Sequence, residues 1–154
     1  MTLYLLALLI GVIAGLRAMT APAAICWAAF HGWINLTGTP LAWMGYHLTP
    51  WIFTVLAVGE LITDQLPATP SRKVPPQFIA RILLGGLSGA AIGASSGLLT
   101  GGAIAGVIGA VIGTLGGAAG RSKLAKGFAS DRPAAIIEDI IAIGGAFLIV
   151  SALA

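Results

Sequence analysis

Hydrophobic residues form six stretches along the chain, separated by short segments that are rich in proline, glycine and polar residues. A helix needs about 20 apolar residues to span the hydrocarbon core of a bilayer, and most of these stretches approach that length. We therefore expect an all-α polytopic membrane bundle of six helices. The expected helices cover residues 2–19, 22–34, 50–66, 77–95, 101–120 and 133–152.

The second stretch, residues 22–34, is short for a full crossing. It either re-enters the membrane or crosses a locally thinned bilayer. The preceding segment contains Arg17 and predicts a tight reversal, either an unwound break at membrane depth or a cytoplasmic turn with Arg17 reaching the interface. Pro22 suits the first turn of a new helix, for which Thr20 or Ala21 is the expected cap.

The composition also indicates a membrane protein. Of the 154 residues, 58% are hydrophobic and 8% are charged, whereas roughly a quarter of the residues in a soluble domain are charged. A soluble fold of this size could not bury so much apolar surface. We expect one membrane domain over residues 1–154, with a first half (1–66), a cytoplasmic linker (67–76) and a second half (77–154).

Basic residues set the expected topology. They form two groups, Arg72, Lys73 and Arg81 in the first and Arg121, Lys123, Lys126 and Arg132 in the second. Positive charge favours the cytoplasmic side, which places loops 67–76 and 121–132 there in the cell inner membrane. Six segments then put both termini outside, and the two halves gain the opposite topology of a 3+3 inverted repeat. If residues 22–34 re-enter, the N-terminus moves inside. The apolar N-terminus lacks a basic region, so we expect no cleaved signal peptide.

Glycines recur at spacings of three and four in the second half, which places each set on one helical face. They are Gly85, Gly89 and Gly93 in one helix and Gly102, Gly106, Gly109, Gly113 and Gly117 in the next. Small residues let helix backbones approach closely in membranes. Two interpretations stay open: close helix contact, including a homodimer interface, or a glycine-lined pore.

The connection over residues 35–50 lacks lysine and arginine, and Trp33, Trp43, Tyr46 and Trp51 surround it, as in an aromatic belt at the outer interface. His31 and His47 alone do not predict a metal site. The single cysteine, Cys26, excludes a disulfide within the chain and a cysteine-based metal motif. We expect no cofactor and no nucleic-acid partner, because the basic groups have no interleaved aromatic residues.

Charged residues near the cytoplasmic ends of the helices are the candidate site. Glu60 and Asp64 are four residues apart and share one helical face. The full set is Arg17, Glu60, Asp64, Arg81, Arg121, Glu138 and Asp139. Because an unpaired charge in lipid is costly, we expect these side chains to face one another.

Three roles are open for this set. Arginines paired with carboxylates would lock the helices together. Carboxylates kept available in a cavity open to the cytoplasm would bind a cation or a proton through hard oxygen ligands. Arg17 and Arg121, with the N-terminus of the helix at 22–34, would form an anion pocket.

Two segments resemble a family of small bacterial membrane proteins. They are Gly15-Leu16-Arg17-Ala18-Met19-Thr20-Ala21-Pro22 and the stretch Glu60-Leu61-Ile62-Thr63-Asp64-Gln65-Leu66-Pro67-Ala68-Thr69-Pro70-Ser71-Arg72. The family is the domain of unknown function 4126. The resemblance covers most of the chain and implies a membrane protein, but it implies no activity and no functional residues.

We expect a small inner-membrane transporter or channel-like protein for an ion or small polar solute, assembled as a homodimer through its glycine-rich helices. The alternative is a non-transporting membrane scaffold or lipid-interacting protein whose buried charges are structural ion pairs. We do not expect an enzyme, because the sequence contains no Ser-His-Asp, histidine-rich metal or phosphate-loop motif.

Overall fold

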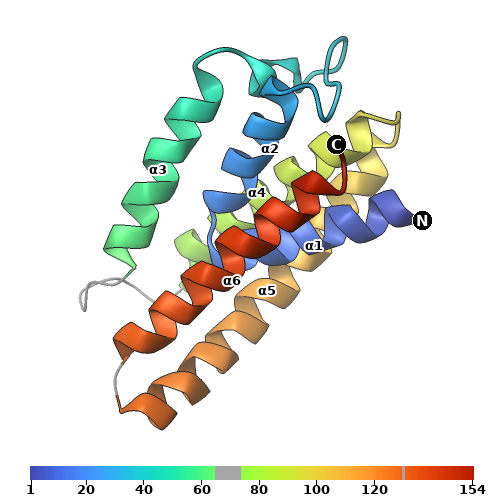
Figure 1. Cartoon of the computed structure of the whole chain (residues 1–154). Helices are drawn as coiled ribbons and strands as arrows, with labels where there is room; N and C mark the ends of the chain where they lie inside the picture. Colours follow the sequence, from blue (N-terminus) through green and yellow to red (C-terminus); the bar gives the residue numbers. More distant parts are fainter. Residues whose placement is uncertain (65–73, 130) are drawn as a thin grey trace.

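The computed structural model describes residues 1–64, 74–129 and 131–154, and its regular elements are helical (Figure 1). The elements are α1 (Thr2–Leu16), α2 (Thr20–Phe30), the short 3-10 helix η1 (Ala42–Gly45), α3 (Thr49–Thr63), α4 (Pro75–Ala94), α5 (Leu99–Phe128) and α6 (Asp131–Ser151). The predicted all-α fold is confirmed. Most of the expected linker and the expected end of the third helix lie outside the described residues.

Three helices, α4, α5 and α6, are long and apolar enough to cross a membrane. The apolar helices α1, α2 and α3 have 15, 11 and 15 residues. At a rise of about 1.5 Å per residue they extend over roughly 16 to 22 Å, less than the hydrocarbon core of about 30 Å. The described chain therefore combines three helices of spanning length with three shorter apolar ones.

Helices α1, α4 and α5 form the tightly packed centre of the bundle. Glycines line their contacts, and a side chain at these positions would overlap a neighbouring backbone. A Cβ atom at Gly102 would meet the Gly89 carbonyl oxygen, and one at Gly113 would meet that of Val12. The predicted close packing is confirmed. The pore interpretation is wrong at these glycines, because helix backbone fills the space in front of them.

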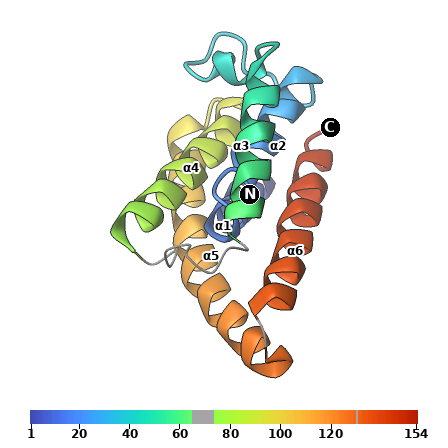
Figure 2. The same cartoon turned by 90° about the vertical axis from the view of Figure 1, so that its left-hand side faces the viewer.

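Helices α2, α3 and α6 cover one side of this centre (Figure 2). Helix α2 packs against both α3 and α6, while α3 has its main contacts with α2 and η1. The outward faces of α3 and α6 carry large exposed hydrophobic side chains, such as Val55 and Ile62 on α3 and Ile140 on α6. Those faces suit contact with lipid chains.

Several expected boundaries are corrected. Helix α5 continues to Phe128, so residues 121–128 are helical rather than part of a loop. Each glycine near the end of α5, such as Gly120 or Gly127, costs only about 1 kcal/mol in a helix. The alanines and lysines between these glycines favour the helix, so the glycines do not end it. The end comes at Ala129, whose φ of 54° is left-handed. Pro75 and Pro76 open α4 instead of closing the linker, as prolines in a first helical turn can.

The chain termini lie at one end of the molecule, together with the connections over residues 31–48 and 95–98 (Figure 1). The connection between α5 and α6 lies at the opposite end. Helix α5 has 30 residues, or about 45 Å, so its basic C-terminal part extends beyond a hydrocarbon core of about 30 Å.

Candidate functional site

The chain reverses direction between α1 and α2. Arg17 ends α1 in an extended conformation (φ −139°, ψ 110°), and Met19 caps α2, so the expected cap at Thr20 or Ala21 is corrected by one or two residues. Pro22 lies in the first turn of α2, where its missing N–H is not needed. Arg17 is 0% exposed. The interpretation as a cytoplasmic turn with Arg17 at the interface is therefore wrong, and the reversal is a buried helix break.

A helix break leaves backbone N–H and C=O groups without partners in the helix. Side chains from other helices bind them here. The Glu60 carboxylate on α3 accepts hydrogen bonds from the N–H groups of Ala18 (2.8 Å) and Met19 (2.7 Å). Arg81 on α4 donates to the Gly15 carbonyl oxygen at 3.1 Å. The broken backbone is thus satisfied inside the protein, which is required where water is absent.

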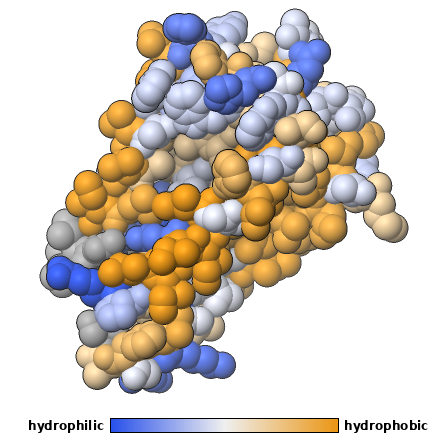
Figure 3. All heavy atoms as spheres, in the orientation of Figure 1, coloured by the Kyte–Doolittle hydropathy of each residue, from blue (hydrophilic) through white to orange (hydrophobic). Residues whose placement is uncertain are grey.

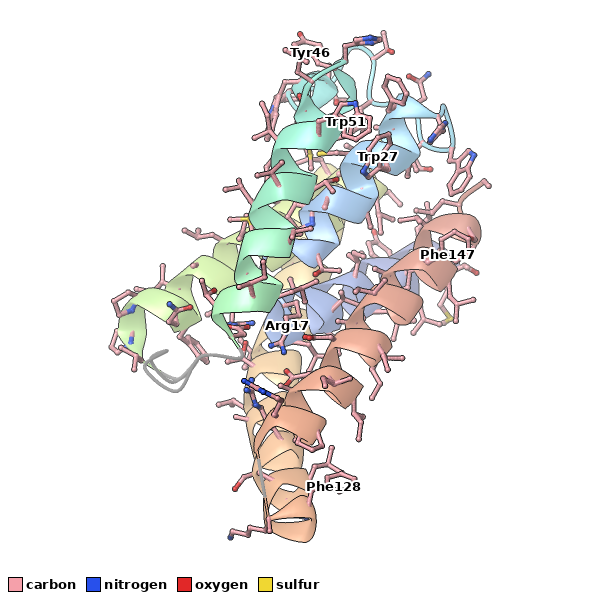
Figure 4. All side chains as sticks on the ribbon, turned by 60° about the vertical axis from the view of Figure 1, so that its left-hand side comes forward. Arg17, Trp27, Tyr46, Trp51, Phe128 and Phe147 are labelled. Carbon is pink, nitrogen blue, oxygen red and sulfur yellow. The ribbon has the colours of Figure 1, made fainter. Side chains whose placement is uncertain are left out.

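Arg17 lies at the centre of the charged side chains (Figure 4). Its Nε donates to Asp139 Oδ1 on α6 at 2.6 Å, and its NH1 donates to Asp64 Oδ2 on α3 at 2.8 Å. Glu138 Oε1 lies 3.7 Å from the same NH1. The bonds of 2.6 and 2.8 Å join charged partners, and charge-assisted hydrogen bonds of such lengths are stronger than bonds between neutral groups. Arg17 therefore ties α3 and α6 to the break, although α3 and α6 have no extensive contact of their own.

Two further arginines complete the network. Arg81 NH2 lies 3.5 Å from Glu60 Oε1 and 3.9 Å from Asp64 Oδ2. Arg121 on α5 lies 3.7 Å from Glu138 Oε2 and donates to the backbone carbonyl oxygen of Asp64 at 3.0 Å. All seven charged residues singled out from the sequence thus meet in one place, here called the charge network.

The geometry of the charge network limits its chemistry. Its carboxylates accept from arginines and backbone N–H groups, and no group of three or more His, Cys, Asp or Glu among the described residues is arranged to hold a metal ion. Within the described residues, four carboxylates interact with three guanidinium groups.

A groove of about 400 Å³ lies beside the charge network, between α2, α3 and α6. Its lining is almost entirely apolar and includes Ala24 of α2, Leu61 of α3 and Phe147 of α6. A second cavity, of about 620 Å³, lies in the 31–48 connection and includes Asn35 and Thr37. Neither cavity is lined by a residue of the charge network.

Sequence reasoning missed this groove. Its walls come from α3 and α6, which lie far apart in the chain and have no extensive contact with each other, so no local pattern marks it. Two features of its lining are unusual for lipid-facing helices: Trp27 Nε1 donates to Thr54 Oγ1 at 2.8 Å, and Thr20 carries a hydroxyl. Thr20 is 8% exposed, and its hydroxyl has no hydrogen-bond partner within the part of the chain that the structure describes.

No family model, curated protein or solved structure matches the chain. The resemblance to the domain of unknown function 4126 therefore stays a prediction.

Proposed function

We propose that the protein is a lipid-interacting protein of the cell inner membrane in which the charge network holds helices together and moves no solute. The observation that carries this proposal is that the buried side chain of Arg17 is paired with carboxylates from two other helices. Its guanidinium is 0% exposed and contacts Asp64 at 2.8 Å and Asp139 at 2.6 Å. A solute site must exchange its partners at every cycle, whereas exchange here would leave a buried charge unpaired at a cost of about 3–5 kcal/mol.

The proposed topology has six membrane segments, with α1 and α2 forming a hairpin that reverses at Arg17. Both termini are outside, and the connections over 67–74 and 129–130 are cytoplasmic. The common position of the two termini and the basic residues near the opposite end support this orientation. An inverted repeat stays a prediction. In that scheme α2 and α5 are equivalent, yet they have 11 and 30 residues.

A homodimer also stays a prediction, and its interface must differ from the one expected. Gly106 and Gly109 face α4 and α1 of their own chain, where a Cβ atom would meet the carbonyl oxygens of Gly85 and Leu8. A second copy cannot use those positions. Such a dimer could instead use exposed apolar faces, which occur on α3 and α6 and also on α4 and α5, at Leu83 and Ile112 for example.

The second candidate function is transport of an ion or small polar solute. One observation favours it: the chain breaks between α1 and α2, and discontinuous helices form the binding sites of many transporters. In this alternative, Glu60 and Asp64 take up a proton or cation while Arg17 exchanges its carboxylate partners.

A flux assay decides between the two functions. Purified protein is reconstituted in liposomes, and uptake of protons, Na⁺, K⁺, chloride and small polar solutes is compared with that of empty liposomes. The proposed function predicts no protein-dependent flux. Flux that is present in the wild type and lost in Glu60→Gln or Asp64→Asn, with the melting temperature (Tm) unchanged, would establish transport and overturn the proposal.

A further inference from the structure

Helix α5 is longer than the membrane core. It begins at Leu99, beside the 95–98 connection and at the end of the molecule that holds both termini. About 20 residues, or roughly 30 Å of helix, cross the hydrocarbon core, and the interfacial layer beyond it is about 5–8 Å thick. The last turns of α5, residues 121–128, therefore pass through the head-group layer of the cytoplasmic leaflet, and Lys123 and Lys126 lie at its level.

This end of α5 has two unlike faces. Lys123 and Lys126 are three residues apart and share one face, whereas Leu124 and Phe128 are four residues apart and share another. Both lysines are exposed, and so are Leu124 (37%) and Phe128 (51%). Figure 3 shows hydrophilic residues next to hydrophobic ones at this end of the molecule, and Figure 4 places Phe128 at the opposite end from the outer aromatic residues. Lysines on one face with leucine and phenylalanine on the other are typical of helices at the boundary between head groups and acyl chains.

The two lysines differ from the arginines of the charge network in their partners. The chain has five acidic residues, and four of them are bound within the charge network. Among residues 1–64, 74–129 and 131–154, neither Lys123 nor Lys126 forms an ion pair. The described structure therefore presents two ammonium groups to an anion from outside the chain.

We propose that Lys123 and Lys126 bind the head group of an anionic phospholipid of the cytoplasmic leaflet, while Leu124 and Phe128 contact the adjoining part of its acyl chains. Anionic lipids attract lysines that follow a transmembrane helix, provided that the lysines lie within a Debye length, about 8–10 Å, of the membrane surface. The length of α5 meets this condition, and the apolar face beside the lysines suits acyl chains better than a soluble acidic partner. This inference rests on the proposed function and its membrane orientation, and it adds the class of lipid and the site.

The test is a lipid titration of the full chain in detergent, followed by native mass spectrometry. Phosphatidylglycerol and phosphatidylethanolamine with the same acyl chains are compared, so that only the head group differs. Each lysine near an anionic surface contributes a factor of about five, so we expect phosphatidylglycerol to bind about 25-fold more tightly at low salt. The preference should fall steeply as the salt concentration rises, because salt screens exposed charges. Equal affinities at low salt, or a preference that salt leaves unchanged, would overturn the inference.

A matched pair of double variants locates the site. Lys123→Gln with Lys126→Gln removes both charges and should lose most of the preference for phosphatidylglycerol. Lys123→Arg with Lys126→Arg keeps both charges and should retain it. Both double variants should have the Tm of the wild type in detergent without lipid, because the exposed lysines make no ion pair among the described residues. A glutamine variant that keeps the full preference would contradict the inference.

The flux assay separates this inference from the proposed function. Solute flux together with a phosphatidylglycerol preference that depends on the two lysines would overturn the function and leave the site at the end of α5 intact. No flux and no head-group preference would overturn the inference alone.

Discussion

Replacing Gly106 with alanine is expected to lower the free energy of unfolding by about 3 kcal/mol or more. A Cβ atom at this position would overlap the Gly85 carbonyl oxygen and lie 3.0 Å from the Cα of Gly89. Both neighbours are helix backbone, so no side chain can move aside, and α4 must separate from α5. Helix α1 is loosened as well, because Gly11 packs directly against the backbone of Gly106. A Cβ atom at Gly11 would meet the Gly106 carbonyl oxygen.

Gly116→Ala is the matched control for this prediction. Gly116 lies in the same helix and has no atom within 4 Å of an added Cβ. Alanine there should raise stability by about 0.5–1 kcal/mol, because glycine in a helix interior is disfavoured by that amount. The measurement is chemical unfolding in detergent micelles, followed by circular dichroism. Equal stabilities of the two variants would show that the helices do not pack as described.

Replacing Arg17 with methionine is expected to cost about 3–5 kcal/mol, because the change leaves the Asp64 and Asp139 carboxylates without their shared partner. Methionine keeps much of the length of the side chain, so the lost charge dominates over lost packing. The same unfolding measurement applies. We also expect proteolysis within the α1–α2 reversal to increase, since the break loses its central side chain.

Lys123→Met is the control for charge removal. Lys123 is exposed near the end of α5, and the change there should stay within about 0.5 kcal/mol. An Arg17→Met variant as stable as the control would mean that the buried charges do not hold α3 and α6 in place.

The sequence predicts the helices well and their ends less well. Apolar length marks each helix, whereas ends depend on contacts between distant residues. Arg17 shows this clearly: four apolar or small residues on either side allow a helix to continue, yet the carboxylate of Glu60 binds the N–H groups of Ala18 and Met19 and ends it. Gly120 and Gly127 of α5 show the opposite case. These residues favour a helix end locally, yet the helix continues through them to Phe128.

The charge network follows from the sequence for a physical reason. Charged groups in an apolar chain have few partners, so the need to neutralise them brings together residues from five helices. Which atoms pair could not be predicted, because the pairing depends on how each helix is rotated in the bundle, and contacts between distant residues set those rotations. The groove could not be predicted at all, because it is a space between side chains rather than a residue pattern.

The structural role of the charge network is the central claim, and a double-mutant cycle between Arg17 and Asp139 tests it most directly. Unfolding free energies are measured for Arg17→Met, Asp139→Leu and the combined variant. We predict that the combined variant is more stable than Arg17→Met alone, with a coupling of about 2 kcal/mol or more, because the buried carboxylate is removed together with its partner. Additive losses, with the combined variant the least stable of the three, would contradict the claim.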